Sequence, residues 1–386
     1  MGFTKWQNGT VVIGDSISTE AYGTSWATQV ATDLGVTINK LAIGGTGCRK
    51  QLSELYKVMP ATQDVCLASF VGFNNTRVLA ASAAPRYAFI KAAHRSFCAS
   101  QFAAEVKFPV VSNANVTFSG SVPSTTTLSE LANYVSRAWY FRNGGDASAD
   151  MFNKTVAVNE TITITNLTGS TIAIGTFGSD GSTMNLSRFK VTVDGVDKVT
   201  YTPNGNSYVG SISSEGFKEG IINDAVIISG LSNTPHTVVI TFLDAKQGII
   251  DWYGALKPAP FCKTIPVYVL DLPHLVDTPS LGYNYPGYVT TQAVMDDCSD
   301  QRKANLQSTF PDYPIAFIDI NFLHGAGYYH PETNPDQITA ADKIHPTTLG
   351  GTKIKLRVLD LMQEDPVTAN TNNGMMLNSI FIGLSR

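Results

Sequence analysis

Val11-Val12-Ile13-Gly14-Asp15-Ser16 is the stretch that decides the fold. Its three apolar residues predict a short buried strand, and the glycine after them predicts a strand-to-helix turn. In α/β folds such turns lie at the carboxyl edge of a parallel sheet, which is where these folds bind ligands. Ser16 is then a candidate nucleophile, because the N–H groups of the following helix carry partial positive charge and can stabilise an oxyanion.

Strand and helix signals alternate along the first hundred residues, and the same alternation returns near the C-terminus. We expect strands at 11–13, 36–43, 64–70, 266–270 and 315–318, and helices at 25–34, 77–105, 289–306 and 349–362. Pro85 interrupts the second of these helices. Because buried strands separated by helices favour parallel pairing with right-handed crossovers, the sequence predicts an α/β fold with a parallel sheet flanked by helices.

The residues between these two α/β parts follow a different pattern. From about Pro109 to Leu256, apolar and polar residues alternate with period two, as in Thr161-Ile162-Thr163-Ile164-Thr165, and Asp194-Gly195 is a hairpin-turn signal. This segment predicts an all-β sandwich of the jelly-roll type. The predicted domains are an α/β domain made of residues 1–108 and 257–364, an inserted β-sandwich at 109–256, and a C-terminal tail at 365–386.

The tail is rich in asparagine and ends in the apolar segment Ile380-Phe381-Ile382. Two interpretations remain open for it. The segment packs on the body of the protein as a strand or arm, or it forms a contact in an oligomer.

Composition excludes several classes of function. The chain has 386 residues, of which 43% are hydrophobic and 15% charged, and its net charge is -4. Nucleic acid is therefore not an expected partner, since the chain has no basic stripe to neutralise phosphates. No stretch is apolar enough to predict membrane insertion. The five cysteines are odd in number and widely spaced, which fits neither a zinc site nor a dense disulfide framework and predicts reduced thiols. We expect no metal or other cofactor.

Two features of the sequence point to different compartments. The abundance of Asn, Thr, Ser and Gly with few charges is typical of proteins that work outside cells, yet the N-terminus shows no secretion signal. A component of a virion tail, folded in a host cytosol, would reconcile the two. An extracellular protein whose leader has been removed would also do so.

A base for Ser16 occurs far downstream, in Asp342-Lys343-Ile344-His345-Pro346. Acyl transfer from an ester needs a nucleophile, a base held in one tautomer, and donors for the developing oxyanion. His345 is the candidate base, and Asp342 is close enough along the chain to accept its Nδ1–H. Asp271-Leu272-Pro273-His274 is a rival pair with the same spacing, and His274 would line the pocket even if it is not the base. The other histidines, His94, His236, His324 and His330, are expected to be surface or packing residues.

Two further segments supply candidate oxyanion donors. The loop Gly44-Gly45-Thr46-Gly47 follows the second predicted strand, so an N–H unshielded by a Cβ atom can face the pocket. Asn74 follows the third predicted strand and offers a side-chain amide. Turn formation by the glycines, and helix capping by Ser16 or Asn74, are the alternative interpretations of these residues.

These four blocks resemble those of the SGNH, or GDSL-type, hydrolase family, over about residues 1–108 and 257–362. The resemblance implies a flavodoxin-like parallel sheet and a serine esterase. It implies Ser16 as nucleophile, His345 as base, Asp342 as its orienter, and the backbone N–H groups of Ser16 and Gly45 with the Asn74 amide as oxyanion donors. Asn75 departs from the family pattern, in which an Asp follows that Asn, and we expect altered loop hydrogen bonding with activity retained.

The combination of these blocks with an inserted β-domain and an Asn-rich tail resembles bacteriophage tail proteins that de-O-acetylate bacterial surface polysaccharides. The resemblance implies an acetylated polysaccharide as substrate, and a homotrimer by analogy with tail spikes. Aromatic residues of the insert either stack on sugars or form its core: Trp139, Tyr140, Phe141, Trp252 and Tyr253. The alternatives are a broad short-chain esterase or lipase, and a non-catalytic, lectin-like receptor-binding protein.

Overall fold

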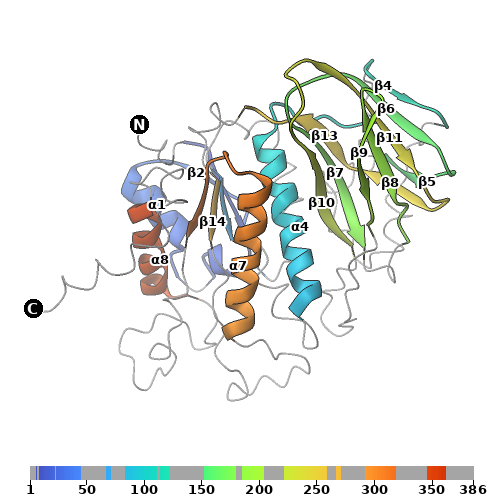
Figure 1. Cartoon of the computed structure of the whole chain (residues 1–386). Helices are drawn as coiled ribbons and strands as arrows, with labels where there is room; N and C mark the ends of the chain where they lie inside the picture. Colours follow the sequence, from blue (N-terminus) through green and yellow to red (C-terminus); the bar gives the residue numbers. More distant parts are fainter. Residues whose placement is uncertain are drawn as a thin grey trace, which may run out of the picture.

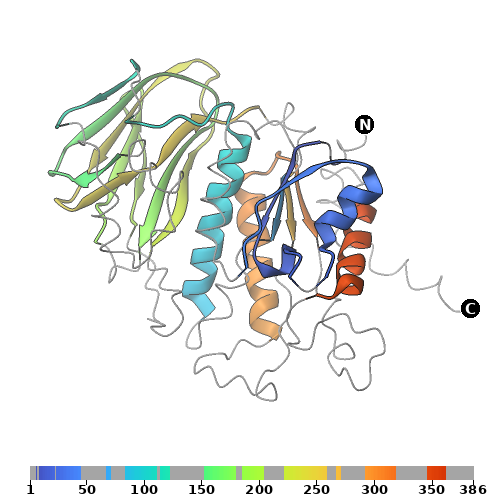
Figure 2. The same cartoon turned by 180° about the vertical axis from the view of Figure 1, so that it is seen from behind.

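An α/β layer and a set of antiparallel sheets make up the described part of the protein, with helix α4 between them (Figure 1). The computed structural model describes Trp6 and residues 8–21, 23–44, 67–70, 83–110, 114–121, 152–179, 185–203, 221–258, 267–270, 292–318 and 346–361. The same arrangement seen from behind is shown in Figure 2.

The α/β layer is built on a five-stranded sheet in the order β15-β14-β3-β1-β2. All four pairings in this sheet are parallel. The strands are β1 (Thr10–Gly14), β2 (Ile38–Lys40), β3 (Leu67–Phe70), β14 (Val267–Leu270) and β15 (Ile315–Ile318). Every residue of β1 is buried, as its run of β-branched residues predicts for a strand covered on both faces.

Helices cover both faces of this sheet. Helix α1 (Trp26–Leu34) packs with α8 (Thr348–Leu361) on one face, and α4 (Ala83–Phe102) packs with α7 (Gln292–Thr309) on the other (Figures 1 and 2). The predicted ends of α1 are confirmed: the Ser25 side chain accepts a hydrogen bond from the Thr28 N–H, and Gly35 takes a left-handed φ of 66°.

The observed bounds of β2 and α4 differ from the predicted ones. Strand β2 is shorter than the predicted 36–43, although the chain continues beside β1, where the Leu41 N–H bonds to Val12 O at 2.8 Å. Helix α4 ends at Phe102 and not at 105, because Ala103 turns away to bridge Leu256. Pro85 lies in the first turn of α4, where the missing N–H has no partner to lose.

The antiparallel strands form a three-stranded sheet β10-β7-β13, a five-stranded sheet β4-β6-β11-β8-β9 and the pair β12-β5. Their bounds are β4 (Val116–Phe118), β5 (Phe152–Thr155), β6 (Thr161–Thr168), β7 (Ile172–Ser179), β8 (Phe189–Val193), β9 (Val196–Tyr201), β10 (Ile221–Ile228), β11 (Pro235–Phe242), β12 (Gln247–Ile250) and β13 (Trp252–Ala255). The jelly-roll connectivity stays a prediction, since residues 122–151 and 204–220 lie outside the described part.

One hydrophobic cluster joins these antiparallel sheets face to face, and we call the assembly the sandwich. Ile162 and Ile164 of β6 point into this cluster while the threonines between them are partly exposed, which confirms the predicted alternation. The predicted hairpin is also confirmed: Asp194 and Gly195 both have positive φ, 51° and 80°, between β8 and β9.

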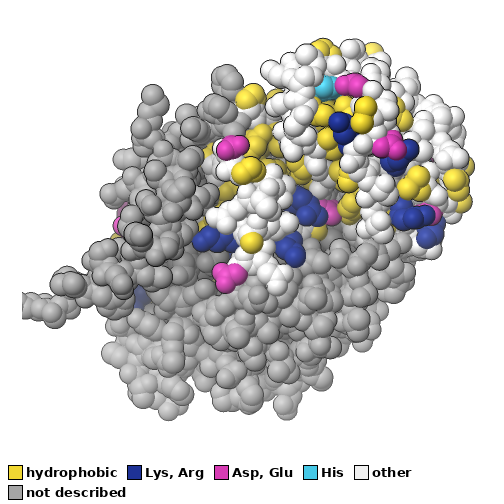
Figure 3. All heavy atoms as spheres, in the orientation of Figure 1, with side chains coloured by type: hydrophobic (Ala, Val, Ile, Leu, Met, Phe, Trp, Pro, Cys, Tyr) yellow, Lys and Arg dark blue, Asp and Glu magenta, His cyan; other side chains and the backbone are white. Residues whose placement is uncertain are grey.

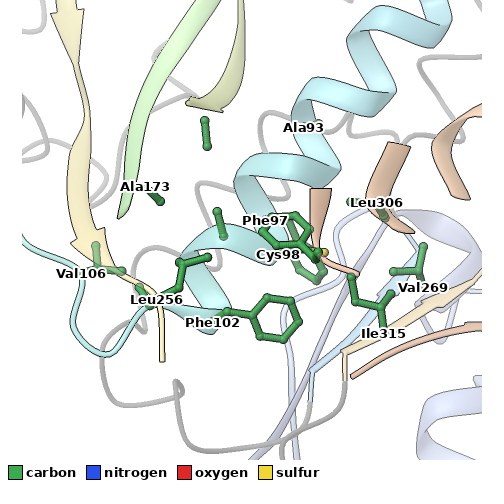
Figure 4. Packing of buried hydrophobic residues seen from close by; sticks show 14 of the residues in the cluster. Ala93, Phe97, Cys98, Phe102, Val106, Ala173, Leu256, Val269, Leu306 and Ile315 are labelled. Atoms are coloured by element: carbon green, nitrogen blue, oxygen red, sulfur yellow. The ribbon is translucent and has the colours of Figure 1, made fainter. Parts of the chain in front are cut away.

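Helix α4 is packed on two sides. In Figure 4 its residues Phe97 and Phe102 lie between Leu256 on the sandwich side and Val269 and Ile315 of the parallel sheet, and all five belong to one buried cluster. The two layers therefore share a core across α4. The residue boundaries predicted for the domains stay predictions.

Charged side chains reinforce this junction. The Arg95 guanidinium on α4 donates to Asp224 Oδ1 on β10 through Nη2 at 2.6 Å and through Nε at 2.9 Å. Tyr201 donates its hydroxyl to the other carboxylate oxygen at 3.0 Å. The Asp224 side chain is only 5% exposed, so this ion pair is largely removed from water.

Candidate active site

Ser16 lies directly beyond the carboxyl end of β1, as its sequence position predicts. It opens the short 3-10 helix η1 (Ser16–Ser18) and is 9% exposed. Asp15 caps this turn, with its Oδ1 accepting the Ile17 N–H at 3.0 Å. The Ser16 carbonyl accepts the Thr19 hydroxyl at 3.0 Å and the Thr19 N–H at 3.3 Å. These hydrogen bonds hold the backbone of the turn in place at the edge of the sheet.

The strand order gives this edge a special place. The strand that follows β1 in the chain, β2, lies on one side of β1, and the strand of this sheet that follows β3, β14, lies on the opposite side of β3, so the connections diverge between the neighbouring strands β1 and β3. Ligands of open α/β sheets bind at the carboxyl ends of strands where the connections diverge in this way. Ser16 follows the strand at that position.

The loop after β2 lies against Ser16. The Ile43 N–H bonds to Gly14 O at 3.1 Å, which holds the chain beside the end of β1. A Cβ atom placed on Gly44 would lie 3.7 Å from Ser16 Cβ, so the two residues are neighbours. Gly44, the first residue of the predicted glycine loop, therefore lies beside Ser16, and the role of Gly45 stays a prediction.

The start of α8 lies against the segment that follows Ser16. Thr348 accepts the Thr24 N–H with its hydroxyl at 3.1 Å and the Gln29 Nε2–H with its carbonyl at 3.0 Å. A Cβ atom on Gly23 would meet Thr348 Oγ1 at 2.6 Å, which shows how closely the two backbones approach. Residues more than three hundred positions apart in the sequence therefore meet here.

The remaining predicted site residues lie outside the described part of the chain: Asp342, His345, Gly45, Asn74 and the rival pair Asp271 and His274. The same holds for Trp139, Tyr140 and Phe141 in the insert. Their roles stay predictions.

A carboxylate that the sequence analysis missed lies four residues after Ser16. Glu20 accepts hydrogen bonds from the Ser25 N–H at 2.6 Å, from the Ser25 hydroxyl at 2.9 Å and from the Thr28 hydroxyl. It also pairs with the Lys40 ammonium at the end of β2. Partial burial raises the pKa of Glu20, but the hydrogen bonds from Lys40, Thr28 and Ser25 outweigh it and lower the pKa from 4.5 to about 2.

No sequence signal marked Glu20, because it lies in a loop and its partner lies in a strand twenty positions away. A helix N-cap box would have been recognised, but that pattern places the acidic residue after the cap and not before it.

Two aromatic residues that were candidates for sugar stacking are core residues. Trp252 is fully buried and Tyr253 is 1% exposed, both on β13. Trp252 belongs to the cluster shared with α4, and Tyr253 to the cluster inside the sandwich. The core interpretation of these two residues is confirmed, so they offer no face to a glycan.

The two described histidines are packing residues, as expected. His94 on α4 is fully buried, with Arg302 Nη1 3.4 Å from its Nε2. His236 is 3% exposed, and its ring nitrogens lie 2.6 Å from Asp194 Oδ2 and 2.8 Å from Ser232 O. The hydrogen bond to Asp194 raises the pKa of His236 above its ordinary value of 6.5.

Several charges in the described part of the sandwich are paired. Over the described part of the face in Figure 3, acidic and basic side chains lie beside one another. Arg188 with Asp244 and Lys190 with Asp197 are two such pairs, at 2.9 and 3.0 Å.

Within the described residues, no group of three or more His, Cys, Asp or Glu side chains could hold a metal ion. No helix in the same residues is long and apolar enough to span a membrane.

Burial removes the Cys98 thiol from reactive chemistry. Cys98 on α4 is fully buried in the cluster of Figure 4, and burial raises the pKa of its thiol.

Comparisons with known proteins give distant structural similarities. No family model matches the sequence, and no curated protein sequence matches it significantly. One similar structure is a two-domain esterase (CEX) active on acetylated mannans, with 10% identity and a TM-score of 0.35 over 66% of this chain and 92% of that one. Another is a family 35 carbohydrate-binding module from an environmental isolate, with 13% identity and a TM-score of 0.23 over 40% of this chain and 98% of that one. With scores this low, the function has to be argued from the chain's own residues.

Proposed function

We propose that this protein is a serine esterase that removes O-acetyl groups from a bacterial surface polysaccharide. The observation that carries the proposal is the position of Ser16 at the carboxyl end of β1, with Gly44 against it. Three features support acyl transfer at this place. They are a hydroxyl at the sheet edge, adjacent backbone amides, and a nearby chain segment that leads to a histidine.

The proposed reaction has two halves. Ser16 Oγ attacks the acetyl carbonyl carbon while His345 takes the hydroxyl proton and Asp342 orients its ring. The oxyanion accepts hydrogen bonds from the N–H groups of Ser16 and Gly45 and from the Asn74 amide. The sugar hydroxyl leaves with the proton from His345, and water then attacks the acetyl–Ser16 ester to release acetate.

The hydrogen bonds between the start of α8 and the start of α1 support His345 as the base. Thr348 is hydrogen-bonded to Thr24 and Gln29, beside the segment that follows Ser16. His345 is three residues before Thr348, so the chain keeps its Cα atom within about 11 Å of that anchor.

The low exposure of Ser16 supports a small acyl group. Ser16 as a whole residue is 9% exposed, and so little open space favours a slender acyl group over a branched or long one. An acetyl ester on a projecting sugar hydroxyl meets this requirement. The location in a virion tail or outside cells belongs to the same proposal and rests on composition alone.

Acetate release from acetylated bacterial polysaccharides tests the proposal. We expect release by the wild-type protein and a loss of roughly 10⁴-fold or more in kcat for Ser16→Ala. Ser100→Ala is the matched control, since Ser100 is a buried serine on α4 whose hydroxyl bonds to Phe97 O. It should leave kcat unchanged.

Synthetic esters separate the alternatives. p-Nitrophenyl acetate should be hydrolysed much faster than esters of longer acids. Equal rates on long and short chains, without release from polysaccharide, would identify a broad esterase or lipase. Glycan binding without turnover of any ester would identify a lectin-like protein and refute the proposal.

A further inference from the structure

The carboxylate of Glu20 joins three elements around the candidate nucleophile. Glu20 lies two residues after the end of η1. Its carboxylate accepts hydrogen bonds from the N–H and the hydroxyl of Ser25, the residue that caps α1, and it pairs with Lys40 at the end of β2. Lys40 Nζ also lies 3.3 Å from Thr28 Oγ1, on the first turn of α1. The Ser16 turn, the start of α1 and the end of β2 are therefore held by one polar cluster.

Each partner in this cluster is a few residues from a proposed catalytic group. Glu20 is four residues after Ser16, and Lys40 is five residues before Gly45. Between Lys40 and Gly44 the chain is fixed to β1 by the bonds from Leu41 N to Val12 O and from Ile43 N to Gly14 O. A shift at either end of the ion pair would be passed along a short, hydrogen-bonded backbone.

We propose that Glu20 and Lys40 are a positioning pair that fixes the Ser16 turn relative to the oxyanion loop after β2. This inference rests on the proposed esterase function and adds to it two residues that touch neither substrate nor the reacting atoms. The pair acts through Ser16 and the loop at Gly44, by keeping the nucleophile and the oxyanion donors at a constant separation.

The effect of such a pair belongs to the transition state. Oxyanion donors bind the developing negative charge far more strongly than the neutral carbonyl, so misplacing them lowers kcat and leaves ground-state binding unchanged. Errors of about 1 Å in catalytic geometry cost on the order of 10²-fold in rate. A residue that serves stability alone would instead reduce the amount of folded enzyme without changing kcat per folded molecule.

The experiment compares Glu20→Gln and Lys40→Met with Lys40→Arg and with a control outside the site. We expect both uncharged variants to lower kcat by about 10- to 100-fold, with KM within about twofold of wild type. Lys40→Arg keeps the charge and should retain kcat within about threefold. The kcat of the double variant should be about the same as that of the more impaired single variant, because the two residues act as one unit.

Asp244→Asn is the matched control. Asp244 also has a pKa lowered to about 2, by its hydrogen bonds from Arg188, but it lies in the sandwich. Its replacement should leave kcat and KM unchanged. Unchanged kcat in Glu20→Gln and Lys40→Met as well would overturn the proposal.

Hydrogen exchange gives a readout that does not depend on hydrolysis. In Glu20→Gln, the amides of Leu41 and Ile43 should exchange at least about tenfold faster, while those of β6 in the sandwich keep their rates. If the wild-type protein hydrolyses no ester, the esterase proposal fails, and the exchange rates alone decide whether Glu20 positions this loop. Unchanged exchange at Leu41 and Ile43 would then refute the positioning role.

Discussion

Strands β1 and β6 show how the two layers of this protein differ. β1 is buried at all five positions, and the residues after it, Asp15 and Ser16, are polar yet almost inaccessible to water. β6 alternates, with isoleucines inward and threonines at the surface. A strand covered on both faces delivers polar groups into a low-dielectric site, where their electrostatic interactions are strong. Strands covered on one face keep their polar groups in water and supply mainly stability.

This contrast predicts that substitutions near the end of β1 change activity and spare stability, and that substitutions in the sandwich do the reverse. The largest effect is expected for the base. His345→Ala should lower kcat by roughly 10⁴-fold or more with an unchanged unfolding midpoint, because in the proposed mechanism His345 takes the proton of Ser16. Steady-state kinetics beside His274→Ala checks this. A dead His274→Ala and a normal His345→Ala would reverse the assignment of the base.

The oxyanion amide should give the next largest effect. Asn74→Ala should reduce kcat by roughly 10² to 10³-fold with little change in KM, since it removes one donor to the developing charge. Asn75→Asp, which introduces the residue found at this place in the motif that the sequence resembles, is its comparator and should keep kcat. Equal losses in the two variants would point to loop disruption in place of a specific donor.

The junction between the layers should affect stability alone. Asp224→Asn removes the carboxylate charge that pairs with the Arg95 guanidinium in a site where Asp224 is 5% exposed, and should lower the free energy of unfolding by about 2 to 3 kcal/mol. Urea unfolding measures the loss. Asp197→Asn removes an exposed pair with Lys190 and should cost less than about 1 kcal/mol. A fall in kcat for Asp224→Asn would show that the sandwich acts on the site.

The smallest expected effect is a pH dependence located in the sandwich. Asp194 raises the pKa of His236 in the folded state, so the stabilisation is complete below the ordinary pKa of 6.5 and is lost as pH rises through the folded value. Asp194 is the charged group that acts on this ring, and Lys198 acts in turn on Asp194. The urea midpoint should fall between pH 6 and pH 9, and this fall should be larger in the wild-type protein than in His236→Asn. Parallel curves would show that His236 does not contribute.

Local signals in the sequence were enough for the elements on either side of Ser16. The run at Val11 to Ile13, the cap at Ser25 and the stop at Gly35 each act within a few residues, so their outcome depends little on the rest of the chain. The same is true of Asp194-Gly195, where the turn type is set by two backbone conformations.

Features that depend on distant contacts could not be predicted in this way. Glu20 and Lys40 are ordinary surface residue types, and only the folded backbone brings them together. Arg302 is fully buried on α7 with its Nη2 bonded to Leu270 O, although arginine in a helix favours a solvated position. Trp252 and Tyr253 could equally have faced a glycan, because burial of an aromatic depends on which sheet covers it. For the candidate site, the sequence supplied Ser16 and its glycine neighbour, and the structure supplied the pair that holds them.

The order of the parallel sheet has a consequence for how the protein is made. β3 pairs with β1 on one side and with β14 on the other, and β14 lies at Val267–Leu270. At ordinary rates of translation, a ribosome needs about 10 to 40 s to advance from Phe70 to Val267. During that interval the hydrogen-bonding edge of β3 has no native neighbour on one side. Nascent chains of this protein therefore present an open strand edge to chaperones and to one another until synthesis has passed the insertion.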